Sequence, residues 1–311
     1  MDVLFPPAAM GAIVAVIGLE LAGSAAQMAG LVAGPAGLSA EQIASNPVMQ
    51  MAWIKVSLFT LAITIICNVF FRGFLAIIPV LVGVVSGYIL ASFMGLVDAS
   101  GMAAAAWFAL PHTYVPKFVP AAMFTILPAA LVVVVEHVGH LIVTSNIVGR
   151  DLTKDPGLHR SLLGNGIATT LSALFGSSPS TTYGENIGVM ALTKVYSTWV
   201  IKGAAIIAIV LSLIGKFSAA VASIPTPVMG GVCLLLFGVI AASGIRILVE
   251  GKVDYSQPKN LVLTAVILII GISGAQINMG AVSLKGMALA TIVGMILALI
   301  FALGEKFLPE E

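Results

Sequence analysis

Apolar stretches long enough to cross a membrane follow one another along the whole chain. The hydrocarbon core of a bilayer is about 30 Å thick and takes about 20 apolar residues in helical conformation. The pattern predicts an all-α membrane protein with ten transmembrane segments, at 3–31, 51–70, 74–97, 120–148, 158–176, 180–194, 196–216, 226–248, 258–276 and 284–304.

The sixth segment differs from its neighbours because polar side chains interrupt it. Six hydroxyl-bearing residues lie between Gly176 and Gly184, and Glu185 and Asn186 follow at the start of a helix of only about two or three turns. Such a helix is about 15 Å long, which is half the thickness of the hydrocarbon core. We therefore predict a short broken helix near 180–194, in which a brief strand leads into a half-helix.

A broken helix inside a membrane indicates a site. Non-helical backbone is tolerated at membrane depth only where protein buries it or where it lines a cavity. Many transporters hold a polar substrate at the N-terminal end of a half-helix, where N–H groups are unpaired and the helix dipole is positive. The sequence therefore predicts a membrane transporter whose substrate site lies at this segment.

The composition agrees with a multi-pass membrane protein. Of the 311 residues, 59% are hydrophobic and only 9% are charged, far fewer than in a soluble domain, and the mean hydropathy is +1.12. The net charge of +1 and the lack of a basic cluster give no indication of nucleic-acid binding. Cys67 and Cys233 both lie in apolar segments, so we expect free thiols and no disulfide.

Lysine and arginine are unevenly divided between the two sides of the membrane. If every segment crosses, one side carries Arg72, Arg150, Lys154, Arg160, Lys194, Lys202, Arg246, Lys252, Lys259 and Lys306. The other side carries Lys55, Lys117, Lys216 and Lys285. Because cytoplasmic loops are enriched in these residues, we expect both chain ends in the cytoplasm.

Two pairs of stretches suggest an internal repeat. Residues 5–11 align with 224–230, and 55–66 align with 259–270, in the same order along the chain. Seven predicted crossings separate the copies, and an odd number gives them opposite orientations, as in the inverted repeats of secondary transporters. The second copy follows four segments, at 120–216, so a symmetric architecture leads us to expect four further segments before the first copy.

The few ionisable side chains inside the segments are candidates for chemistry, because each costs about 2.5–3.5 kcal/mol at mid-membrane on insertion scales. Glu136 and His140 are four residues apart and share one helix face, whereas His137 points about 100° away. Glu185 opens the half-helix. Carboxylates accept N–H bonds and free helix N–H groups donate to carbonyls, so a flat pyrimidine or purine base would suit this mixture.

Other interpretations of these residues stay open. Glu136 and His140 could form a purely structural pair, and Glu185 could be structural as well. Glu136, His137 and His140 are metal-ligand types, but their spacing is not the His-Glu-x-x-His zinc pattern, so we predict no metal site. Glu20, in the middle of the first segment, could be structural or part of a gate. No nucleophile–base pair is present, so we do not expect an enzyme.

Two stretches resemble the motifs of a known transporter family. In the signature of the nucleobase–ascorbate transporters, an acid or amide precedes Asn, then Gly, then Thr and a basic residue. The chain matches it with Glu185, Asn186, Gly188, Thr193 and Lys194. Residues 136–140 are similar to a site in the eighth span of that family. The resemblance is to the bacterial, uracil-transporting members, and it runs from residue 5 to residue 290.

The resemblance implies a fold of fourteen spans in two inverted repeats of seven, arranged as a gate domain and a core domain. The chain would then correspond to family spans five to fourteen and lack the first four. The implied domains are gate spans five to seven at 1–97, an interfacial connection at 98–118, core spans eight to eleven with the substrate site at 119–216, and gate spans twelve to fourteen at 217–311.

The same resemblance implies roles for individual residues. Glu136 and Glu185 would bind the uracil ring through hydrogen bonds, and backbone N–H groups around Tyr183 and Gly184 would meet a ring carbonyl. His140, together with Glu136, would couple transport to protons. Phe237 would line the substrate site at a position where the related uracil transporters carry Tyr, so a hydroxyl contact is lost there.

The function implied is proton-coupled uracil uptake across the bacterial cytoplasmic membrane, impaired in a chain that lacks four spans. The resemblance implies no cofactor apart from the coupling proton, and no metal. A purine or xanthine permease of the same family and a non-transporting uracil-binding membrane fragment are the alternatives. The expected partners are uracil and the lipid bilayer, with no nucleic acid, and a homodimer is left open.

Overall fold

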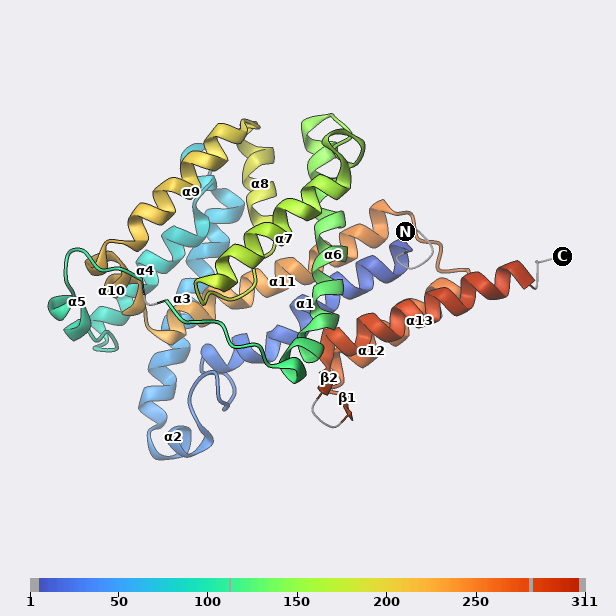
Figure 1. The fold of residues 1–311 in the computed structure, drawn as a ribbon. Helices are drawn as coiled ribbons and strands as arrows, with labels where there is room; N and C mark the ends of the chain where they lie inside the picture. Colours follow the sequence, from blue (N-terminus) through green and yellow to red (C-terminus); the bar gives the residue numbers. More distant parts are fainter. Residues whose placement is uncertain (1–5, 112, 280–281, 308–311) are drawn as a thin grey trace. The chain divides into compact units, whose positions relative to one another are not determined.

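The computed structural model describes residues 6–111, 113–279 and 282–307, and most of them are helical (Figure 1). The first half of the chain contains α1 (Pro7–Met28), α2 (Ala40–Ser45), α3 (Pro47–Phe70), η1 (Gly73–Ala76), α4 (Pro79–Phe93), α5 (Ser100–Ala104) and α6 (Pro120–Val148). The second half contains η2 (Thr153–Gly157), α7 (Leu158–Leu174), α8 (Gly184–Thr193), α9 (Thr198–Ser212), α10 (Gly215–Ala222), α11 (Thr226–Glu250), α12 (Pro258–Ile272), β1 (Gln276–Met279), β2 (Val282–Lys285) and α13 (Gly286–Phe307).

The all-α membrane class is confirmed. A helix occupies each of the ten predicted segments, although residues 3–5 of the first segment lie outside the described part of the chain. Within the described part, α1, α3, α6, α11 and α13 are long and apolar enough to cross a membrane. The helices α4, α9 and α12 are apolar but shorter. The protein is therefore a multi-pass membrane protein.

The helix boundaries follow residues whose backbone chemistry starts or stops a helix. Prolines occupy the first helical position of α3, α4, α6 and α12, where the missing N–H costs nothing. The side chain of Asn46 caps α3 by accepting from Met49 N at 3.0 Å. Gly149 ends α6 in the left-handed conformation, at φ 69°.

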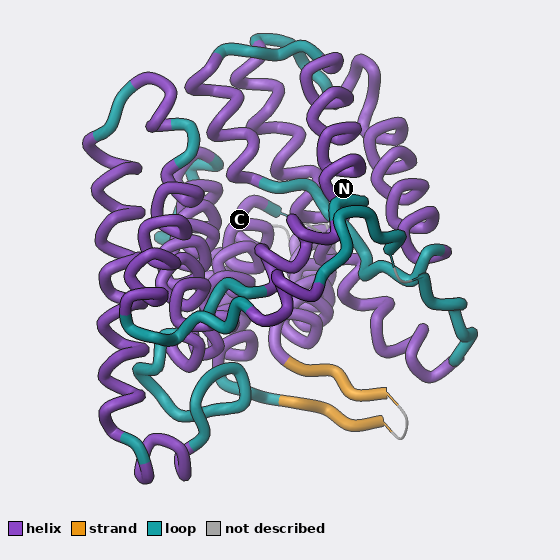
Figure 2. The backbone as a smooth tube through the Cα atoms, turned by 90° about the vertical axis from the view of Figure 1, so that its left-hand side faces the viewer, coloured by secondary structure: helices purple, strands orange, loops and turns teal. Residues whose placement is uncertain are grey.

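The chain divides into two compact units, and the first consists of Met1–Glu20, Thr113–Ile187 and Gly238–Glu311. The core of this unit joins α1, α12 and α13 through small and branched apolar side chains. They are Ala8, Ala9, Ala12, Ile13 and Val16 of α1, Leu263 and Ile267 of α12, and Ala290 and Ala298 of α13. An antiparallel hairpin of β1 and β2 connects α12 to α13 (Figure 2).

The second unit consists of Leu21–His112 and Gly188–Phe237. Here α3 and α4 pack closely because Gly83 and Gly87 lie against the threonine hydroxyls of α3, where a Cβ would overlap them. Those hydroxyls, on Thr60 and Thr64, donate to carbonyls of their own helix at 2.8 and 2.7 Å. The assignment of gate and core roles to the predicted ranges, and the inverted repeat, stay predictions.

Candidate functional site

The helix α6 carries the two polar side chains that the sequence analysis placed on one face. Glu136 and His140 are half-buried and lie one turn apart in a largely apolar helix of 29 residues. His137, between them in sequence, is only 4% exposed. Because an i,i+4 pair lies on one helix face, Glu136 and His140 can meet the same neighbouring segment.

That neighbouring segment is the predicted break. The helix α7 ends at Leu174, Gly176 has φ 83°, and α8 begins only at Gly184. The ten-residue half-helix α8 is about 15 Å long, as predicted. The brief strand expected before it is an irregular stretch in the structure, since residues 177–183 form neither helix nor strand. Six hydroxyl side chains provide alternative hydrogen bonds there, which disfavours regular structure.

Two consecutive threonines of the irregular stretch contact the polar face of α6. The Thr181 hydroxyl donates to Glu136 Oε2 over a long 3.4 Å. The Thr182 hydroxyl oxygen is 2.8 Å from His140 Nδ1. On the other side of the stretch, the Thr169 hydroxyl of α7 donates to the Ser180 carbonyl at 3.0 Å. Side chains of α6 and α7 therefore both hold the break in place.

The start of α8 lies against the imidazole of His140. A Cβ placed on Gly184 would be 3.1 Å from His140 Nε2, which is tighter than an ordinary van der Waals contact. Glycine at this position therefore makes room for the ring. Both nitrogens of His140 consequently face the short stretch from Thr182 to Gly184.

His137 contacts a different segment from the one that Glu136 and His140 contact. Its Nε2 is 2.7 Å from the Ser161 hydroxyl of α7, and its buried Nδ1 has no hydrogen-bond partner among the described residues. This contact joins α6 to α7. Within the described part of the chain, no three His, Cys, Asp or Glu side chains gather where they could hold a metal ion.

The remaining predicted residues are placed as follows. The side chains of Tyr183 and Asn186 are exposed at the start of α8. Glu185 and Gly188 lie in α8 by their backbone, and the surroundings of the Glu185 side chain are outside the described part of the structure. Phe237 is half-buried on α11 and belongs to the second unit.

The last two signature residues mark the end of the half-helix. Thr193 donates its hydroxyl to the Val189 carbonyl at 2.9 Å, and Lys194 follows with φ 56°, outside helical geometry. The signature thus runs from the second residue of α8 to the residue that follows its end. The contacts of Thr169, Thr181 and Thr182, and that of Ser161, were not predicted. The run of hydroxyl residues was the available signal for the pair Thr181 and Thr182.

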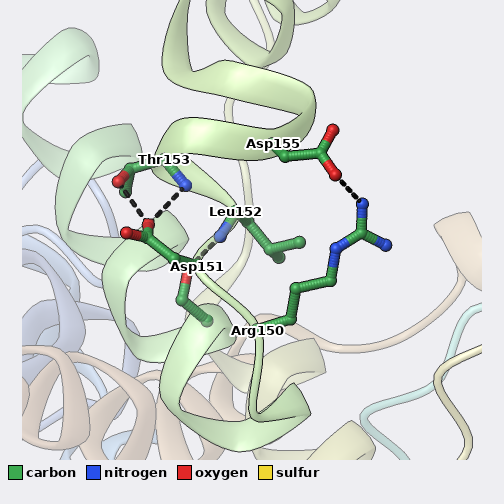
Figure 3. A network of polar contacts seen from close by, with 6 residues as sticks. Arg150, Asp151, Leu152, Thr153 and Asp155 are labelled. Carbon is green, nitrogen blue, oxygen red and sulfur yellow. Dashed lines mark hydrogen bonds and ion pairs between the residues drawn. The ribbon is translucent and has the colours of Figure 1, made fainter.

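The turn that joins α6 to α7 is a separate network of polar contacts (Figure 3). The carboxylate of Asp151 accepts from the hydroxyl and the N–H of Thr153 at 2.5 and 3.1 Å, and it lies 3.0 Å from Lys154 Nζ. These contacts, the Thr153 hydroxyl first, lower the pKa of Asp151 to about 2. Arg150 pairs with Asp155 at 2.5 Å, and Leu152 N donates to Ser145 at 3.0 Å. The network fixes the path of the chain between the two helices.

The chain is similar to proteins of one known family. A family model described as "Permease family" matches residues 1–280. The uracil permease of Escherichia coli strain K12 is 62% identical over 311 residues, which cover the whole chain and 70% of that protein. The uracil permease of Paenibacillus larvae is 60% identical, with 98% of the chain and 71% of the relative covered, and that of Bacillus subtilis is 47% identical, with 96% and 68% covered. The resemblance described above is therefore confirmed.

Proposed function

Because the chain belongs to this permease family, we propose that it carries uracil across the bacterial cytoplasmic membrane together with protons. Three relatives between 47% and 62% identical are named uracil permeases, which supports the choice of substrate. Uptake rather than efflux, and a cytoplasmic location of both chain ends, are parts of the same proposal. The proton is the coupling ion, and no other cofactor is proposed.

One observation carries the proposal. Glu136 and His140, one turn apart on an apolar helix, contact the two threonines that precede the half-helix α8. Carboxylate and imidazole are costly within a bilayer and are kept where they bind or transfer something. Both of these contacts are made to an irregular stretch that leads into the N-terminus of a helix.

The chemistry of uracil matches the groups at this place. Its ring presents N–H donors and C=O acceptors in one plane, and we propose that Glu136 and Glu185 accept from the ring N–H groups. The backbone N–H groups around Tyr183 and Gly184 would donate to a ring carbonyl, as the unpaired first turn of a helix allows. Phe237 would supply an apolar contact.

We assign binding of the coupling proton to Glu136 and His140 on α6. We propose that protonation of the Glu136–His140 pair favours substrate binding, after which the core and gate parts of the transporter move relative to each other. The signature residues Asn186, Gly188 and Thr193, with Lys194, are assigned to the shape of α8, which presents its first turn to the substrate.

The function is tested by uracil binding to the purified chain and by uptake in the 62%-identical relative, with each substitution made at the aligned residue. Glu136→Gln replaces a charged acceptor by a neutral amide. We expect about tenfold to a hundredfold weaker uracil binding, since hydrogen bonds to charged groups contribute about 1.5–3 kcal/mol. His140→Leu should abolish the pH dependence of uptake.

The matched control is Glu41→Gln, a carboxylate on the short exposed helix α2, which should leave binding and uptake unchanged. Wild-type affinity in Glu136→Gln would remove that residue from the site. A normal pH dependence in His140→Leu would remove the proposed role in coupling.

The other functions differ in measurable ways. A purine or xanthine permease would bind xanthine in competition with uracil, and with higher affinity. A uracil-binding membrane fragment would bind uracil without moving it. The prediction that these 311 residues alone transport poorly is tested by uptake into vesicles that contain only this chain, and rapid uptake would contradict it.

A further inference from the structure

A pocket of about 310 Å³ opens on the surface of the second unit, where the first turns of α3 meet the end of α4. Its lining is apolar apart from one charged side chain, that of Lys55. Val48 and Met51 of α3 are 79% and 52% exposed, so the pocket is open to the surroundings of the protein. The lining residues are Pro47, Val48, Met51, Ala52, Lys55 and Met94.

The charge of Lys55 stands alone on its helix. Lys55 is the one charged residue among the 24 residues of α3, and it lies about 12 Å along the helix from Pro47. A charged side chain on a membrane-spanning helix is costly unless an opposite charge or water reaches it. The ion pairs in the described part of the chain are all made by other residues. The ammonium group of Lys55 therefore has no counter-charge from these residues.

The aligned lysine in the second copy of the suggested repeat does have a carboxylate partner. Lys55 aligns with Lys259 of α12, and Lys259 pairs with Glu305 of α13. The helices α12 and α13 pack against each other, as α3 and α4 do. However, α4 contains no acidic residue, and Met94, which follows it, lines the pocket. Asp98, the first acid after α4, is not among the lining residues. The first copy thus presents the lysine without the negative charge that the second copy supplies.

We propose that this pocket binds an anionic phospholipid. The headgroup phosphate pairs with the Lys55 ammonium, and an acyl chain lies along Val48, Met51 and Met94. A free anion would pair with the lysine but leave the apolar lining uncovered. A lipid without net charge would cover the lining and leave the lysine without a counter-charge. A molecule with a negative head and an apolar tail satisfies both parts of the pocket.

The bound lipid would hold two helices together. Because residues of α3 and the residue after α4 line the same pocket, a lipid in it contacts both. A ligand that binds only the folded state stabilises that state. The inference goes beyond the proposed function and does not rest on it, since the pocket and its charge are independent of uracil.

Tryptophan fluorescence can report on this pocket alone. Trp53 follows the lining residue Ala52 in α3, and the chain has three tryptophans. The other two, Trp107 and Trp199, are 71% and 76% exposed, so both can be replaced by Phe with little effect on folding. Quenching of Trp53 is then measured in bilayers that contain phosphatidylglycerol or phosphatidylcholine with brominated acyl chains. The two lipids differ only in the headgroup, so the ratio of their quenching gives the preference for negative charge.

We expect phosphatidylglycerol to bind near Trp53 about fivefold more strongly than phosphatidylcholine, as one lysine near anionic headgroups allows. In Lys55→Gln this preference should disappear. Lys117→Gln is the matched control, because it removes one positive charge from an exposed connection outside the pocket, and the preference should stay.

A second variant supplies the missing carboxylate from the protein itself. Met51→Glu places it one turn before Lys55, at the i,i+4 spacing at which a glutamate followed by a lysine pairs well. The preference for phosphatidylglycerol should disappear here too, although Lys55 is intact. Met49→Glu adds the same charge on another face of α3, outside the lining, and should keep the preference.

Equal quenching of Trp53 by the two lipids in the wild-type sequence at these positions would overturn the proposal. A preference that persists in Lys55→Gln would do the same, because the lysine would then not be the group that selects the lipid. Loss of the preference in Lys117→Gln would also contradict it, since the effect would then follow the total charge of the chain and not this pocket.

Discussion

Gly184 is the residue at which an added atom would disturb the candidate site most directly. Its backbone starts α8, and its missing side chain leaves the space that the His140 ring occupies. Its φ is not among the positive values of the chain, so alanine can adopt the same backbone conformation. Alanine also favours helices over glycine by about 1 kcal/mol. A substitution here therefore separates an effect on the ring from an effect on folding.

We expect Gly184→Ala to bind uracil about fivefold more weakly while folding normally. The new Cβ would stand 3.1 Å from His140 Nε2, so the ring must shift by a few tenths of an ångström. Moving a side chain away from its preferred rotamer costs about 1 kcal/mol. Uracil affinity is measured on the purified chain. Gly164→Ala in α7, where a Cβ meets open space, is the matched control. Equal affinity in Gly184→Ala and wild type would show that the ring position does not matter.

The sequence identified some residues of this site and not others, for a physical reason. Glu136 and His140 were predictable because helical periodicity places residues four apart on one face. Their partners Thr181 and Thr182 lie in an irregular stretch, where no periodicity tells which hydroxyl points where. His137 was placed on another face by the same geometry, but its partner Ser161 belongs to the next helix and required the packing to be known.

At the scale of elements, the structure favours one of the two roles left open for Glu20. This is the one ionisable residue of α1, and its carboxylate Oε2 accepts from Met287 N at the start of α13, at 2.8 Å. Gly286 lies against the same carboxylate, where a Cβ would overlap it, and has φ 55°. Negative charge at a helix N-terminus is stabilising. Glu20 therefore acts as a cap that fastens α13 to α1, which is a structural role.

Removing this cap should destabilise the protein. We expect Glu20→Ala to lower the thermal unfolding midpoint in detergent by a few degrees, since losing a helix cap costs about 0.5–2 kcal/mol. Glu20→Gln keeps a neutral acceptor and should lose less. Glu41→Ala, on the exposed helix α2, serves as control. If Glu20→Ala unfolds at the wild-type temperature but transports or binds differently, the gating role is the correct one.

Across the whole chain, the sequence predicted the helices better than the segments and contacts that connect them. Long apolar runs located the helices, because the thickness of the bilayer sets the length of each crossing locally. The paired strands at 276–285 overlap the end of the predicted segment 258–276 and the start of 284–304, and they were not predicted. The two strands pair with each other, and the cap from Glu20 to Met287 joins residues 267 positions apart. Contacts of that range leave no pattern in the local sequence.

The orientation of the chain is the remaining property that charge alone predicts, and impermeant thiol labelling in intact cells can test it. Lys and Arg favour one side by ten to four, so residues 32–50 and 98–118 should face outward and the turn at 149–157 should face the cytoplasm. In a background without Cys67 and Cys233, cysteine at Glu41 should react from outside. Cysteine at Asp151 should react only after permeabilisation.

A second pair of positions tests whether the labelling depends on the side of the membrane and not on how exposed each cysteine is. Asp98 and Asp254 both lie in exposed connections, and each has its pKa lowered by hydrogen bonds from a nearby serine, so the two surroundings are alike. We expect cysteine at Asp98 to behave like that at Glu41, and cysteine at Asp254 like that at Asp151. The reverse pattern at all four would invert the orientation. If cysteine at Asp254 alone departs from this pattern, a segment between residues 151 and 254 does not cross, and the broken segment at 180–194 would be the first to re-examine.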